Sequence, residues 1–108
     1  MLAIATHFAI IKLEGSKMKR LKSYKVKNKR FFISFELNPL TNELDPHIWI
    51  RHLIEPHEAI NAWFKISTQE LNICYDRYEA YSEDYKLNIY YVFMDNDPDK
   101  VLIISAFR

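Results

Sequence analysis

The chain has 108 residues, the length of one small domain, and 49% of them are hydrophobic, which is enough to build a buried core. The formal net charge is only +1, so total charge singles out no partner, and the single cysteine, Cys74, excludes an intrachain disulfide and fits a cytoplasmic protein. No stretch reaches the roughly 20 apolar residues of a membrane-spanning helix, so we expect no membrane association.

The first segment, residues 1–17, ends at Gly15 and Ser16, where the composition changes sharply. We expect this segment to be either a poorly ordered N-terminal extension or a first strand. Residues 18–108 are then expected to form a single α+β domain.

The next segment is strongly basic. From Lys17 to Arg30 it carries eight basic residues and no acidic one, whereas residues 31–108 carry thirteen acidic and six basic residues. Such an asymmetry indicates either contact with a nucleic acid or an acidic protein, or a solvated face. The candidate RNA-binding residues are the basic side chains of this segment: Lys19, Arg20, Lys22, Lys25, Lys27, Lys29 and Arg30.

A strand with one buried face is predicted from Arg30 to Leu37, because Phe31, Ile33 and Phe35 alternate with less apolar positions. The composition of residues 38–42 then predicts a turn.

Two short helices are predicted after this turn. Asp45 and Pro46 are typical of a helix start and favour a helix from Pro46 to Leu53. A second helix is predicted from Pro56 to Ile66, where apolar residues recur at helical spacing. The two remain separate because a proline inside a helix would kink it.

The last third of the chain predicts three strands, Glu70–Tyr81, Tyr85–Met94 and Val101–Phe107. Their connections are short, so neighbouring strands should be antiparallel. The expected architecture is therefore α+β: a strand, two short helices and a three-stranded antiparallel meander.

Alternation within Glu70–Tyr81 places Arg77, Glu79 and Tyr81 on one face of the expected strand. Cys74 falls on the opposite face and is expected to be a small core residue.

Four motifs carry a family resemblance, and they occur in this order: Phe35-Glu36-Leu37-Asn38-Pro39, Arg51-His52 followed by Glu58-Ala59, Asp76-Arg77-Tyr78, and Ile103-Ile104-Ser105-Ala106. The chain from Phe35 onward thereby resembles the BrnT family of bacterial toxins, small ribonucleases of a RelE-like fold. The resemblance implies a sheet with helices on one face, RNA cleavage and a cognate antitoxin. Leu53 stands where the family has glycine, and Phe107 stands where it has arginine.

Metal-independent RNA cleavage needs a base for the 2′-hydroxyl, an acid for the leaving oxygen and a cation for the phosphoryl oxygens. We assign His52 as base or acid, Arg51 and Arg77 as phosphate clamps, and Glu79 or Tyr81 as a partner in proton transfer.

The same residues could instead have purely structural roles. Arg77 would pair with Glu79 or Asp76 across the sheet, and His52 would cap or hydrogen-bond within the helix junction. Neither a metal nor a cofactor is expected, because His47, His52 and His57 are five residues apart and point about 140° away from each other on a helix.

The function predicted from these features is a metal-independent endoribonuclease of the toxin–antitoxin type. The alternative is a non-catalytic protein-binding module on the same fold. The expected partners are RNA and either a cognate antitoxin or another protein. Self-association into a homo-oligomer is a further alternative.

Overall fold

The computed structural model describes residues 3–12 and 18–108. In chain order its elements are β1 (Ala3–Lys12), β2 (Met18–Val26), β3 (Lys29–Leu37), β4 (Leu44–Pro46), α1 (His47–His52), α2 (Pro56–Trp63), β5 (Thr68–Asn72), β6 (Arg77–Ser82), β7 (Leu87–Phe93) and β8 (Lys100–Phe107).

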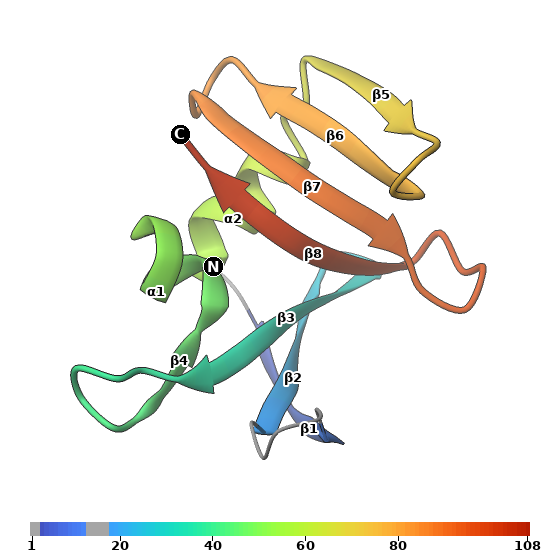
Figure 1. The fold of residues 1–108 in the computed structure, drawn as a ribbon. Helices are drawn as coiled ribbons and strands as arrows, with labels where there is room; N and C mark the ends of the chain where they lie inside the picture. Colours follow the sequence, from blue (N-terminus) through green and yellow to red (C-terminus); the bar gives the residue numbers. More distant parts are fainter. Residues whose placement is uncertain (1–2, 13–17) are drawn as a thin grey trace.

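All eight strands belong to one mixed sheet (Figure 1). Seven of them follow the order β1-β2-β3-β8-β7-β6-β5, and β4 pairs with the end of β3. The pairings are antiparallel except that of β3 with β8, which is parallel and joins residues 30–33 to 100–103. No helix in the described part of the chain is long and apolar enough to cross a membrane.

This sheet corrects the expected architecture of one strand, two helices and a three-stranded antiparallel meander. The chain is mostly strand, its sheet is mixed, and its helices cover only 6 and 8 residues. One reason is the basic segment, which forms the strand β2, although no strand was predicted there. Ser23 and Tyr24 on β2 are buried, and the cations between its apolar residues concealed the strand pattern.

A second reason lies in the segment Glu70–Tyr81, which is two strands and not one. The side chain of Asn72 accepts a hydrogen bond from the backbone N–H of Tyr75, and Asp76 adopts a left-handed φ of 51°. Together they make a tight turn between β5 and β6. Cys74 lies in this turn and is exposed, so its expected place in the core was wrong.

The expected strand at residues 30–37 and the expected start of the second helix are confirmed. The first helix was expected to begin at Pro46 with Asp45 as its cap, but Asp45 and Pro46 belong to β4, and α1 begins at His47 without a side-chain cap. α2 begins with Pro56, and the backbone N–H of Glu55 donates to Glu58 Oε1 at 3.2 Å. α1 ends at Leu53, whose left-handed backbone (φ 58°, ψ 36°) closes the helix.

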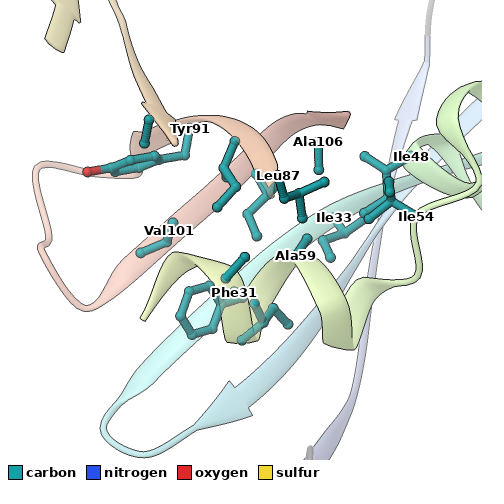
Figure 2. Close-up of a cluster of buried hydrophobic side chains, with 14 of the residues drawn as sticks. Phe31, Ile33, Ile48, Ile54, Ala59, Leu87, Tyr91, Val101 and Ala106 are labelled. Carbon is teal, nitrogen blue, oxygen red and sulfur yellow. The ribbon is translucent and has the colours of Figure 1, made fainter. Parts of the chain in front are cut away.

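The core lies where β3 and β8 meet. Phe31 pairs with Val101 and Ile33 with Ile103, and all four side chains are fully or almost fully buried. Figure 2 shows side chains of β3, α1, α2, β7 and β8 gathered in this core. α1 contacts both β3 and β8, whose ends diverge beside it, and α2 packs against β6 and β7 (Figure 1).

Candidate functional site

The candidate site lies on the sheet face opposite α2. Ala80 and Ile89 are buried on the side that α2 covers, so their sequence neighbours point to the other side. Cross-strand pairing places Glu79 beside Tyr90, Tyr81 beside Asn88, and Asn88 beside Phe107. We call this surface the outer face; it is formed by Arg77, Glu79, Tyr81, Asn88, Tyr90 and Phe107.

Arg77 is held firmly on the outer face. Its Nε donates to Glu79 Oε2 at 2.9 Å, and the Asn72 side chain donates to the same oxygen at 3.0 Å. Its guanidinium carbon lies 4.7 Å from the ring centre of Tyr75 and 4.4 Å from that of Tyr90. The cation therefore contacts two aromatic rings and is fixed by a carboxylate.

The same contacts determine the charge of Glu79. The hydrogen bond from Arg77, followed by that from Asn72, lowers the pKa of Glu79, and partial desolvation opposes them only in part. Glu79 is consequently a carboxylate at neutral pH and can accept a proton but not donate one.

A hollow of about 400 Å³ opens beside this pair. Glu79 and Tyr81 line it together with Glu70, Asn88 and Tyr90. The sequence-predicted trio of Arg77, Glu79 and Tyr81 thus does share one surface, as the alternation indicated.

His52 reaches the outer face through aromatic contacts. Its ring centre lies 5.6 Å from that of Phe107, which lies 5.0 Å from that of Tyr90. Tyr90 in turn contacts Arg77. We call this series the aromatic row: His52, Phe107, Tyr90 and Arg77. It draws one residue from each of α1, β8, β7 and β6.

Sequence reasoning did not assign Tyr90 or Phe107 to the site. Both are ordinary strand residues by pattern, and only the register of β7 against β6 and β8 brings them beside Arg77 and His52. No local signal in the sequence carries that register.

Arg51 joins a different cluster. Its Nε lies 3.7 Å from Glu36 Oε1, the oxygen that also contacts His47 Nδ1 at 3.0 Å. Glu36 was assigned no role in the site from the sequence. His47 and Arg51 are four residues apart and therefore lie on one face of α1.

The candidate RNA-binding cations of the basic segment lie on β2, on the following turn and at the start of β3. β3, β8 and β7 separate β2 from β6 in the sheet, so this segment does not join the aromatic row. Arg20 and Lys25 lie on β2, as does Lys19, whose side chain falls outside the described part of the chain.

Several of these cations contact their own chain. Lys22 lies over the Tyr24 and Phe35 rings, and Lys27 lies over the Phe64 ring. Lys29 forms a 3.2 Å ion pair with Asp99, while Arg30 donates to Ser23 Oγ at 3.3 Å. The cations of this segment therefore contact aromatic, acidic and hydroxyl side chains of their own chain, which was not predicted from the sequence.

Within the described residues, no group of three or more histidine, cysteine, aspartate and glutamate side chains is arranged to hold a metal ion. The side chains of the outer face and of α1 can themselves supply stacking by aromatic rings, phosphate contact by arginine, and proton transfer by imidazole.

Comparison with known proteins adds no assignment. No family model, curated protein or solved structure matched the chain. The function must therefore be inferred from the chemistry of the residues that the fold brings together.

Proposed function

We propose that the chain binds single-stranded RNA on its outer face and cleaves it without a metal ion, the activity implied by its resemblance to BrnT-type toxins. The observation that carries the proposal is the aromatic row, in which Arg77 contacts Tyr90 and the rings continue through Phe107 to His52, together with the contact of Arg77 with Tyr75 beside the row.

The row combines the two contacts that single-stranded RNA needs. Exposed aromatic rings stack on bases and contribute about 1–3 kcal/mol per base. Arg77 uses its Nε for Glu79, and its terminal amino groups are the ones we assign to a phosphate. Because Tyr75 is 70% exposed, a base can stack on its outer side while Arg77 occupies the inner side.

Cleavage requires a proton acceptor close to a ribose hydroxyl. Glu79 is a weak acceptor because its charge is already stabilised by Arg77 and Asn72. The proton transfer is therefore assigned to imidazole on α1, the helix that carries His52 and meets the row at Phe107.

The test is incubation of the purified chain with end-labelled single-stranded RNA in EDTA. We expect cleavage products ending in a 2′,3′-cyclic phosphate, and a loss of at least about tenfold in kcat/KM for Arg77→Ala. Lys86→Ala is the matched control, since Lys86 is an exposed cation paired with Glu83 on the turn before β7. Intact RNA after incubation with the folded wild-type chain would refute the proposal.

One observation favours the alternative of a protein-binding module. β5 is the last strand of the sheet path, and the exposed side chains of Leu71, Ile73 and Tyr75 lie on it and on the turn that follows. A strand edge with apolar side chains can pair with an extended segment of a partner. This alternative predicts no RNA turnover and protection of the β5 amides from hydrogen exchange in a complex with the partner.

A further inference from the structure

A second cluster of chemically active side chains lies between β3 and α1. His47 Nδ1 lies 3.0 Å from Glu36 Oε1, and Arg51 Nε lies 3.7 Å from the same oxygen. The side chains of Glu36 and His47 are only 18% and 25% exposed, whereas that of Arg51 is 61% exposed. The cluster thus has a largely buried carboxylate–imidazole pair with an exposed cation at its rim.

The orientation of His47 follows from its partner. A carboxylate can only accept, so Nδ1 of His47 carries the proton in this contact and Nε2 is left as the basic nitrogen. A carboxylate that fixes one imidazole tautomer in this way is the arrangement used by general bases in hydrolases and nucleases.

His52 differs from His47 in this respect. Its described contact is the packing of its ring against Phe107, which does not select a tautomer. His57 also contacts a carboxylate, that of Glu55 at 3.2 Å, but both side chains are more than half exposed and lie at the start of α2. Only His47 combines an orienting carboxylate, partial burial and a neighbouring arginine among the described residues.

The cluster lies on the same side of the sheet as the aromatic row. On β3 the buried Phe31 and Ile33 face the core, so Glu36 falls with the residues that alternate with them, on the opposite face. α1 then carries His47 and Arg51 on the flank near β3 and His52 on the flank near β8. An RNA strand stacked on the row and continuing across α1 would meet this cluster next.

We propose that His47, oriented by Glu36, is the general base of RNA cleavage, that Arg51 holds the scissile phosphate, and that His52 stacks on a neighbouring base. This inference rests on the proposed ribonuclease function and names the residues that perform its chemical step.

The step balances without a co-reactant. His47 Nε2 takes the proton of a 2′-hydroxyl, and the 2′-oxygen attacks the adjacent phosphorus while the bond from phosphorus to the 5′-oxygen breaks. The proton returns from His47 through a water molecule to the leaving 5′-oxygen. The products are a 2′,3′-cyclic phosphate and a 5′-hydroxyl, and Arg51 compensates the charge that builds up on the phosphoryl oxygens.

The experiment measures kcat and KM on a single-stranded RNA oligonucleotide in EDTA for the wild-type chain and for His47→Ala, His52→Ala and His57→Ala. We expect His47→Ala to lower kcat at least about 100-fold with little change in KM. His52→Ala should mainly raise KM, and His57→Ala should match the wild type. Added imidazole should restore part of the activity of His47→Ala, which a purely structural role would not allow.

Glu36→Gln tests the positioning residue. Its amide oxygen can still accept from Nδ1 but cannot stabilise the imidazolium, so kcat should fall while KM and the urea midpoint stay near those of the wild type. An active wild-type chain whose His47→Ala variant keeps kcat within threefold would overturn the inference and leave the ribonuclease function standing. An inactive wild-type chain would overturn both.

Discussion

At the scale of single residues, the pair of Arg77 and Glu79 shows how one contact serves both stability and binding. The ion pair is about one quarter exposed, so its contribution to stability is modest. Its larger effect is to hold the guanidinium against the rings of Tyr75 and Tyr90, so that the side chain loses little further entropy when it meets a phosphate.

The lowered pKa of Glu79 predicts a specific loss of stability in acid. Between the folded and the higher unfolded pKa of this carboxyl, the unfolded chain binds a proton that the folded chain does not, so stability falls as pH falls through that interval. Urea midpoints measured from pH 7 to pH 3 should fall less steeply for Glu79→Gln than for the wild type. Glu43→Gln, at an exposed loop carboxylate, should keep the wild-type slope, and equal slopes for all three would contradict this account.

Arg77, Glu79 and Tyr81 could be placed together from the sequence because strand alternation is local. The residues that contact Arg77 and Glu79 could not be predicted from the sequence. Asn72 reaches Glu79 across a turn that the alternation conceals, and Tyr90 reaches Arg77 through cross-strand register. Strand alternation therefore predicted that these three residues share one face, but not which aromatic residues surround them.

At the scale of elements, the residue at the end of α1 is Leu53, which stands where the BrnT family has glycine. This residue is in the left-handed region, which costs a residue with a Cβ about 1–2 kcal/mol and glycine almost nothing. A glycine, which the BrnT family carries at this point, would suit the backbone better, and the Leu53 side chain is 68% exposed and buries little surface in return.

Leu53→Gly should therefore stabilise the chain by about 1 kcal/mol, after allowance for the greater flexibility of glycine in the unfolded state. The free energy of unfolding in urea is the appropriate measure. Leu53→Ala is the matched control, because it removes the exposed side chain and keeps the Cβ that strains the backbone. A glycine variant no more stable than the alanine variant would show that the left-handed cap carries no strain.

The elements that the sequence predicts well are those with a regular pattern and a clear boundary. β3 has uninterrupted alternation, and α1 and α2 begin beside prolines. β2 was missed because its charges hide a strand whose cations lie over aromatic rings of the same chain. The turn at residues 73–76 was missed because apolar side chains occupy it and remain exposed.

At the scale of the whole molecule, the parallel pairing of β3 with β8 joins the two halves of the sheet. The paired residues lie about 70 positions apart in the sequence, and no turn connects them, so local patterns cannot reveal the contact. This one pairing turns the expected antiparallel meander into part of a mixed eight-stranded sheet and brings α1 between β3 and β8.

Residues at the pairing of β3 with β8 should accordingly contribute strongly to the free energy of unfolding. Ile103 is 1% exposed and lies opposite Ile33, so Ile103→Ala should cost about 2–5 kcal/mol in the free energy of unfolding. The adjacent Ile104 is 37% exposed, and Ile104→Ala should cost far less. The free energies of unfolding of both variants can be compared by urea unfolding monitored by circular dichroism. Similar losses of stability in the two variants would argue against a core centred on this pairing.

The central claim is that the outer face with its aromatic row is an RNA-binding surface. Its most direct test is an NMR titration of the ¹⁵N-labelled chain with a 2′-O-methyl single-stranded oligonucleotide, which cannot be cleaved through its 2′-oxygen. We predict that the largest shifts fall on the backbone amides of Arg77, Tyr90 and Phe107 and on the Arg77 side chain, and that added salt weakens them. Shifts confined to β2, or none at concentrations where the chain is folded, would contradict the claim.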